Sequence, residues 1–356
     1  MTGQSPNGQP SFPGSCPLPL MNHRQITLAH GGGGRMSHEL IQKLILPGFK
    51  NEFLEPLHDG AIFSINGTKL AFSTDSFVVN PLFFPGGDIG KLAVCGTVND
   101  LAMCGAVPKY LSASLILEEG FAMEELARVI ASMRATADEA GISLVTGDTK
   151  VVERGKGDKI FINTAGIGIV PDHVNISPRQ ARPGDQILIN GPIAVHGIAI
   201  MSVRDHLEFE TEIRSDCAPL NTLVAALLEA CPETRVLRDP TRGGVASALN
   251  EIAQGSNAGI QIDEASISIS EEVKGACEIL GFDPLYVANE GKLLAIVPRE
   301  GVERALKALR GHPLGRESSI IGEIVESHAG FVTMRTRVGG NRVVDMLAGE
   351  QLPRIC

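Results

Sequence analysis

At residues 71–79 the chain reads Ala71-Phe72-Ser73-Thr74-Asp75-Ser76-Phe77-Val78-Val79, an apolar strand pattern interrupted by one aspartate. A second stretch at 145–152, Val-Thr-Gly-Asp-Thr-Lys-Val-Val, repeats the order Asp, Ser or Thr, any residue, Val, Val. This repeated five-residue pattern is too short to prove an internal duplication. It nevertheless predicts two carboxylates, Asp75 and Asp148, at matching strand ends.

Strand and helix patterns alternate on both sides of these stretches. Asn66-Gly67 predicts the turn of a hairpin, and a helix after Arg35 is expected to stop at Pro47-Gly48. Further strands are predicted at 61–65, 69–74, 110–117, 142–146, 160–170, 186–189, 259–263, 292–297, 319–325 and 330–335. Further helices are predicted at 88–103, 122–140, 194–204, 218–230, 244–254, 270–280 and 301–311.

Mixed elements in both halves indicate an α/β (α+β) protein of two domains. Turn residues at 182–185 precede a strand, so we place the domain boundary just upstream. The predicted parts are a disordered extension at 1–24, an N-terminal domain at 25–175, a C-terminal domain at 176–341 and a mobile tail at 342–356.

The composition narrows the classes of function. The net charge of −10 with scattered Lys and Arg argues against nucleic acid as the main partner. No apolar run is long enough to span a membrane, and the N-terminal extension lacks the features of a signal peptide. We therefore expect a cytoplasmic protein with no membrane partner.

Three aspartates interrupt apolar surroundings in the first half: Asp75, Asp100 and Asp148. A few carboxylates together with substrate phosphates are the usual ligands of Mg²⁺, so the set predicts a metal site. Taken singly, Asp75 and Asp148 could instead cap turns, and Asp100 could cap a helix.

Two glycine-containing segments favour anions. The run Gly31-Gly32-Gly33-Gly34 could present backbone N–H groups to phosphates, although it is equally typical of a flexible turn. The segment 239–244, Asp-Pro-Thr-Arg-Gly-Gly, opens a predicted helix whose N-terminus favours negative charge.

Lys150 and Glu290 are the best acid–base candidates. Lys150 follows a predicted turn at 147–149 beside a candidate metal ligand, and Glu290 precedes an apolar strand. Either could be a solvated surface charge. His30 and His196 stand alone on apolar segments, which favours hydrogen-bonded core residues over ligands.

The chain ends in a cysteine, Cys356, on a short tail that is held from one side only. Such a thiol could carry a covalently attached group into a pocket. The other cysteines of the ordered region follow no metal spacing and are expected to be buried and reduced: Cys95, Cys104, Cys217, Cys231 and Cys277.

Several motifs together closely resemble the HypE family, the carbamoyl dehydratases of nickel–iron hydrogenase maturation. They lie at 30–35, 75–92, 96–103, 145–152, 239–244 and 289–292, with Pro353-Arg354-Ile355-Cys356 at the end. The resemblance covers residues 25 to 356. The aspartate motifs are shared with the wider PurM-like superfamily of aminoimidazole ribonucleotide and selenophosphate synthetases, whereas the terminal motif is specific to HypE.

The resemblance implies ATP-dependent dehydration of a carbamoyl group on Cys356, through a thiocarboxamide, to a thiocyanate. Asp75, Asp100 and Asp148 fall on the nucleotide and Mg²⁺ positions, with Gly32 and Gly33 near the phosphates. Glu290 and Lys150 match the positions that deprotonate the thiocarboxamide nitrogen.

The implied fold is PurM-like and pairs its N-terminal domains into a homodimer. The implied partners are a carbamoyltransferase that loads the thiol and a scaffold complex that receives cyanide on iron. The alternatives are another ATP-dependent synthetase of the superfamily, which would not explain the terminal cysteine, or a non-catalytic adaptor that carries a group on Cys356.

Overall fold

The computed structural model describes residues 25–205, 212–349, 352 and 354–356. The predicted extension at 1–24 lies outside the described residues. The first half forms a five-stranded sheet in the order β1-β2-β7-β5-β6. Its strands are β1 (Ala61–Ile65), β2 (Thr68–Phe77), β5 (Val107–Glu118), β6 (Ser143–Val152) and β7 (Ile160–Ile169).

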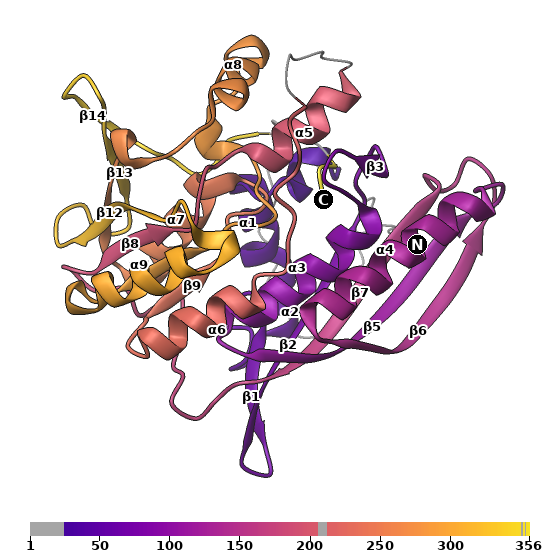
Figure 1. The fold of residues 1–356 in the computed structure, drawn as a ribbon, viewed down its shortest axis with the longest axis horizontal. Coiled ribbons are helices and arrows are strands. Elements are labelled where there is room, and N and C mark those ends of the chain that lie inside the picture. The colour runs from indigo at the N-terminus through magenta and orange to yellow at the C-terminus, as the bar shows by residue number, and fades with distance from the viewer. Residues whose placement is uncertain (1–24, 206–211, 350–351, 353) are drawn as a thin grey trace, which may run out of the picture.

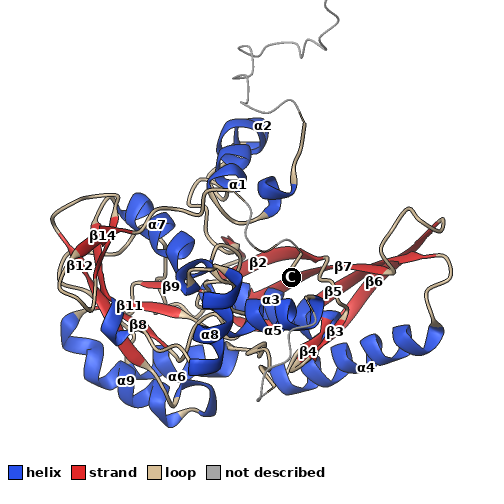
Figure 2. Cartoon of the chain, turned by 90° about the horizontal axis from the view of Figure 1, so that it is seen from above, coloured by secondary structure: helices blue, strands red, loops and turns tan. Residues whose placement is uncertain are grey.

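Two helices cover one face of this sheet (Figure 2). α3 (Ile89–Met103) begins at Asp88, whose carboxylate accepts from the Gly90 and Lys91 N–H groups. α4 (Met123–Ala140) ends at Gly141 with a φ of 69°, the left-handed conformation expected of a terminating glycine. Thirteen of the fifteen α3 residues are buried, because the helix is enclosed on all sides.

The second half forms a seven-stranded sheet in the order β14-β13-β10-β12-β8-β11-β9. Its strands are β8 (Gln186–Ile189), β9 (Val236–Arg238), β10 (Gly259–Asp263), β11 (Leu294–Val297), β12 (Ser319–Val325), β13 (Val332–Arg335) and β14 (Asn341–Val343). Its helices are α5 (Val195–Arg204), α6 (Asn221–Ala230), α7 (Gly244–Ser256), α8 (Glu271–Leu280) and α9 (Val302–Gly311).

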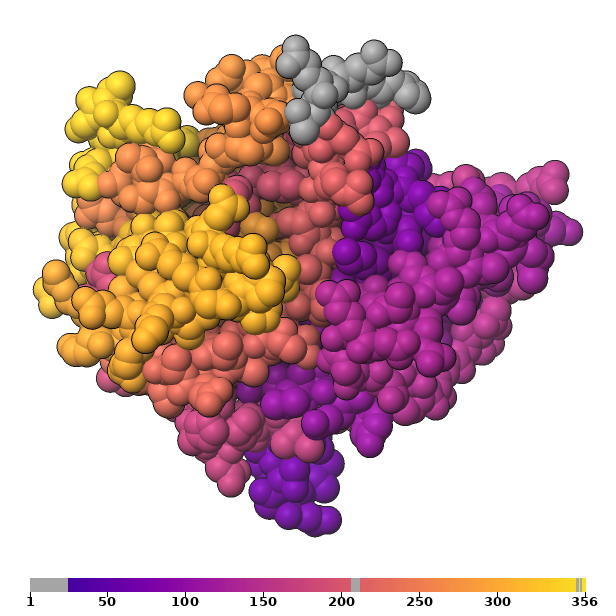
Figure 3. Space-filling view, viewed as in Figure 1, coloured from indigo at the N-terminus to yellow at the C-terminus, as the bar shows by residue number. Residues whose placement is uncertain are grey.

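The two halves pack along one broad junction, and a single set of buried residues spans both (Figures 1 and 3). α3 lies at this junction. Its Asn99 side chain donates to the Ala218 carbonyl at 3.2 Å and accepts from the Leu220 N–H at 2.8 Å. Residues of the first half are therefore held close to loops of the second half, which is where the candidate site lies.

Three local predictions were wrong. Asp75 and Asp148 lie inside β2 and β6, not at strand ends, and the turn predicted at 147–149 is strand. The N-terminal helix does not stop at Pro47-Gly48: α1 (Arg35–Leu40) continues through a π-helical turn at Ile41–Ile45 into α2 (Leu46–Phe49). Asp100 lies near the C-terminal end of α3 and caps nothing at its start.

The short strands β9 and β14, and the pair β3 (Phe83–Phe84) and β4 (Gly87–Asp88), had no sequence prediction. The strand predicted at 142–146 begins correctly, but β6 continues to Val152. The other predicted strands and helices are confirmed within a few residues. Within the described ranges, no helix is both long and apolar enough to cross a membrane.

Candidate active site

The C-terminal tail returns to the junction between the two halves. The Val78 N–H donates to a carboxylate oxygen of Cys356 at 3.0 Å, and the Asn80 N–H donates to the Arg354 carbonyl at 3.1 Å. The tail thus runs antiparallel to the segment that follows β2. Cys356 is only 8% exposed, so the described end of the chain is docked against the body of the protein.

The Cys356 thiol borders a cavity of about 160 Å³, lined also by Gly31, Gly32, Arg242 and Tyr286. Burial raises the pKa of this thiol to about 12, although the nearby Arg242 guanidinium lowers it. A docked thiol is therefore protonated at neutral pH and is a poor nucleophile. Loading of the thiol is chemically easier when the tail is outside.

The predicted glycine run packs on the turn that carries Arg242. Gly33 has a φ of 71°, and a Cβ there would lie 2.5 Å from the Arg242 carbonyl oxygen. Arg242 in turn donates from Nη1 to the Gly31 carbonyl at 2.9 Å. The sequence requires glycine at this position because both the backbone conformation and the available space exclude a side chain.

A carboxylate cluster includes Asp239, which lines a second cavity that shares Gly31 and Arg242 with the Cys356 cavity. Oxygens of Asp59, Asp100 and Asp239 all lie within 4.8 Å of one another. Ser73 donates to Asp100 at 2.7 Å, and Arg238 pairs with Asp59 at 2.6 Å. Asp59 Oδ2 is buried without a hydrogen-bond partner among the described residues.

The cluster holds its carboxylates close together in a buried place, which opposes ionisation. Burial and then the neighbouring Asp239 raise the pKa of Asp100 well above its ordinary value. Burial and then Asp59 raise the pKa of Asp239 to about 7. Asp75 lies near enough to contribute to both shifts, and burial raises its own pKa too. Such a set of hard oxygen donors fits a divalent cation such as Mg²⁺.

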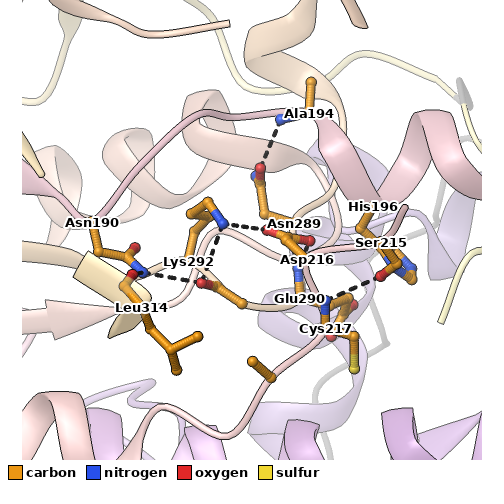
Figure 4. Close-up of polar contacts among 12 residues, drawn as sticks. Asn190, Ala194, His196, Ser215, Asp216, Cys217, Asn289, Glu290, Lys292 and Leu314 are labelled. Carbon is orange, nitrogen blue, oxygen red and sulfur yellow. Dashed lines mark hydrogen bonds and ion pairs between the residues drawn. The ribbon is translucent and has the colours of Figure 1, made fainter. Parts of the chain in front are cut away.

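Glu290 is buried, so the alternative of a solvated surface charge is wrong for this residue (Figure 4). Burial and then Cys217 raise its pKa well above the ordinary range, and Asp239 and Asp75 add to the effect. Its Oε1 has no hydrogen-bond partner among the described residues. The Glu290 charge also raises the pKa of Cys356, so the carboxyl group and the thiol lie within electrostatic range of each other.

Hydrogen bonds fix the loop that carries Glu290 (Figure 4). The Glu290 N–H donates to Asp216 at 3.1 Å, and Asp216 pairs with Lys292 at 2.9 Å. The Asn289 side chain donates to the Pro240 carbonyl at 2.9 Å and accepts from the Ala194 N–H at 2.7 Å. Asn289 therefore joins the Glu290 loop to the segment of Asp239 and to the start of α5.

Asp148 and Lys150 lie elsewhere in the single chain. They form an ion pair at 2.6 Å on β6 and are 60% and 69% exposed. In the sheet register, Asp148 pairs with Ser114, Ser114 with Asn163, and Asn163 with Ser76. Three strand spacings, about 14 Å, separate Asp148 from Ser76. Since side chains alternate between faces, Asp148 and Lys150 lie on the face opposite Asp75.

The structure brings together Asp75, Asp100, Glu290 and Cys356, with Gly32 and Gly33 nearby, and one chain does not bring Asp148 or Lys150 to them. Sequence reasoning missed Asp59, which stands in a short His-Asp-Gly turn before β1, and did not recognise Asp239 as a member of the cluster. A polar turn directly before a strand was the available signal for Asp59.

Comparisons with known proteins cover nearly all of the chain. Residues 57–170 match the N-terminal domain of AIR synthase related proteins, and residues 182–335 match their C-terminal domain. A carbamoyl dehydratase HypE of Cupriavidus necator is 55% identical over 341 residues, covering 96% of this chain and 97% of the relative.

Solved structures agree with this likeness. The HypE chain of a crystal structure of a HypE–HypF complex has a TM-score of 0.83 and 49% identity, covering 86% of this chain and 99% of that one. A hydrogenase maturation protein HypE solved in complex with ATP has a TM-score of 0.79 and 50% identity, covering 93% of this chain and all of the other.

Proposed function

The chain belongs to the HypE family of carbamoyl dehydratases, and on this basis we propose that it dehydrates a carbamoyl group carried on Cys356 with the use of ATP. The observation that carries the proposal is the junction itself, where the terminal thiol lies near the buried carboxyl group of Glu290. A mere carrier of a group would need neither this carboxyl nor the aspartate cluster, and a synthetase would not need the terminal thiol.

In the proposed reaction, phosphorylation converts the carbonyl oxygen, which would otherwise leave as hydroxide, into a phosphate, which is a good leaving group. The carbonyl oxygen of the thiocarboxamide attacks the γ-phosphorus of ATP, ADP leaves, and Glu290 accepts an N–H proton. The C–O bond of the resulting phosphate ester then breaks, the second N–H proton is lost, and phosphate leaves the thiocyanate. A carboxylate whose pKa is raised is a stronger base than an exposed one, which suits Glu290 to a weakly acidic amide.

We propose that Asp59, Asp100 and Asp239 hold Mg²⁺, with Asp75 close by. A bound Mg²⁺ would offset the charge of the nucleotide phosphates and of the carboxylates around it. The cavity at Cys356 adjoins a second of about 280 Å³ lined by Gly33 and Asp239, and that one adjoins a third of about 480 Å³. In this series of cavities, we expect a bound ATP to place its phosphates beside the glycine run. Its nucleoside would then lie in the third cavity, between α1 and α7.

Asp239→Asn is expected to raise the Mg²⁺ concentration needed for ADP formation at least about tenfold, because one hard anionic ligand becomes neutral. Asp263→Asn, at the end of β10 where Asp263 pairs with Arg335, is the matched control and should leave the dependence unchanged. The measurement is ADP release by the carbamoylated protein across an Mg²⁺ titration, with a chelator as the zero point. An unchanged titration for Asp239→Asn would remove this residue from the metal site.

We propose a homodimer formed through the uncovered face of the five-stranded sheet. Exposed apolar side chains gather there: Ile65, Phe72, Tyr110, Ile116, Ile167 and Ile169. This face also carries Asp148 and Lys150, and it extends to Ser76 at the rim of the Cys356 cavity. Pairing through it would give Lys150 of one copy a route to the site of the other, as its predicted catalytic role requires.

Ile167→Glu is expected to weaken self-association about a hundredfold or more, since each copy would bury an unpaired carboxylate. The measurement is molar mass by light scattering over a concentration series. Ile279→Glu on α8, where the isoleucine is 71% exposed, is the control and should leave the mass unchanged. A dimer that survives Ile167→Glu would rule out this face.

A similar HypE has been solved with HypF, and we propose a carbamoyltransferase of that kind as the source of the carbamoyl group. The acceptor of cyanide would be an iron-bearing scaffold complex for nickel–iron hydrogenase. The test of the whole proposal is the intact mass of the carbamoylated protein before and after Mg²⁺ and ATP are added. Loss of one water mass from the C-terminal peptide supports it, and a carbamoyl mass that persists would reduce the protein to a carrier.

A further inference from the structure

His196, the second residue of α5, contacts the tail directly. Its Nδ1 lies 2.8 Å from the Ser215 hydroxyl (Figure 4). Its Nε2 lies 2.7 Å from the carbonyl oxygen of Ile355. The ring is fully buried and packs edge-on against Phe84, with centroids 5.6 Å apart. The expectation of a hydrogen-bonded buried histidine is confirmed, but one of its two partners belongs to the segment that carries the reacting thiol.

The partners determine which ring nitrogen carries the proton. A carbonyl oxygen only accepts, so Nε2 must donate to Ile355. Burial lowers the pKa of His196, which favours the neutral ring, so Nδ1 accepts from the Ser215 O–H. Ser215 Oγ itself accepts from the Cys217 N–H at 3.1 Å. Asp216, the charged group that acts most strongly against this lowering of the His196 pKa, is paired with Lys292.

The carbonyl that His196 binds belongs to the peptide unit joining Ile355 to Cys356. The Val78 N–H holds the terminal carboxylate on the other side of the same residue. Cys356 is therefore fixed at both ends of its backbone. The next residue of α5, Gly197, also lies close to the tail. A Cβ at this position would lie 3.1 Å from the Leu352 side chain.

The start of α5 is rigidly tied to the Glu290 loop. The Ala194 N–H donates to Asn289, and the Gly197 N–H donates to the Ala288 carbonyl at 3.0 Å. A donor on this helix end therefore has a fixed position relative to the proposed base. A shift of about 1 Å between reacting groups can cost orders of magnitude in rate, so a contact that orients the thiol matters to the chemistry.

We propose that His196 is a positioning residue for the tail: its Nε2–H, in the tautomer set by Ser215, holds the Ile355 carbonyl and so orients Cys356 toward Glu290. The catalytic half of this inference rests on the proposed function. The docking half stands on the described contacts and can be tested without ATP or a carbamoyl group.

The test is the rate at which N-ethylmaleimide alkylates Cys356 in the full-length, uncarbamoylated protein, followed by peptide mass. A docked thiol is buried and protonated, so the rate reports the undocked fraction. His196→Ala is expected to react about tenfold faster than the unaltered protein, the factor that corresponds to about 1.4 kcal/mol. His196→Gln keeps an N–H near the Nε2 position and should stay within about threefold of the unaltered protein. Ser215→Ala should fall between them.

The buried cysteines Cys95, Cys104, Cys231 and Cys277 are internal controls that react only if the variant has unfolded. An unchanged Cys356 rate in a folded His196→Ala would overturn the proposal, as would a His196→Gln rate equal to that of His196→Ala. If His196→Ala unfolds, the His196→Gln and Ser215→Ala rates decide by the same ordering. Dehydration tests the catalytic half separately. If His196→Ala speeds alkylation but the unaltered carbamoylated protein loses no water mass with Mg²⁺ and ATP, the proposed function fails and the docking contact stands.

Discussion

Cys356→Ala is expected to abolish dehydration completely. No other described cysteine lies at a chain end and also lines the cavity next to Arg242. The variant should take up no carbamoyl group from the carbamoyltransferase and lose no water mass when Mg²⁺ and ATP are added. Intact mass and the mass of the C-terminal peptide measure both steps.

Cys277→Ala on α8 is the matched control, since Cys277 is a buried thiol that does not line the Cys356 cavity. It should load and dehydrate as the unaltered protein does. A Cys356→Ala variant that still acquires and dehydrates a carbamoyl group would place the acceptor elsewhere in the chain. The proposed role of Cys356 as the acceptor would then be wrong.

Glu290→Gln is expected to slow dehydration by about a hundredfold to ten-thousandfold, the usual contribution of a positioned acid or base. The change keeps the size of the side chain and removes its ability to accept a proton. Carbamoyl loading should be unaffected, because the docked thiol is protonated and we expect loading to occur with the tail outside. The measurement is single-turnover loss of the water mass at saturating ATP.

Glu278→Gln on the exposed side of α8 serves as the control for this substitution and should leave the rate unchanged. Full activity of Glu290→Gln would mean that another group takes the amide proton, and Lys150 of a second copy would become the leading candidate. Loss of carbamoyl loading together with dehydration would instead indicate a general folding defect.

The fold was largely predictable, because it depends on local patterns. Alternating apolar residues predicted the strands, Asn66-Gly67 predicted the hairpin, and Gly141 predicted the end of α4. Short strands such as β9 and β14 escaped prediction because three residues give too little periodicity, and their pairing with distant strands decides their conformation.

The candidate site was predictable only in part. Asp75, Asp100, Glu290 and Cys356 were recognisable from motifs, but nothing local shows that a turn at Asp59 and a loop at Asp239 meet α3. The burial of Glu290 was hidden for the same reason, since it depends on distant segments such as the one that carries Asp216 and Cys217. Asp148 and Lys150 follow a motif, yet their sheet face is decided by strand register, where a shift of one residue reverses every side chain.

The anchoring of Leu347 has a consequence for the strength of docking. The Arg35 N–H donates to the Leu347 carbonyl at 2.8 Å, so only the nine residues beyond it link the body to the thiol. A tether this short keeps its end at an effective concentration on the order of millimolar around the pocket. A handful of backbone hydrogen bonds is then enough to dock the thiol, whereas a free peptide of the same sequence would bind only weakly. The docked form also holds Arg354 at a φ of 54°, a left-handed conformation that costs about 1 kcal/mol. Under the proposed function, we expect weak intrinsic affinity and a short tether to let the same cysteine occupy the pocket for dehydration and then leave it for transfer to the acceptor.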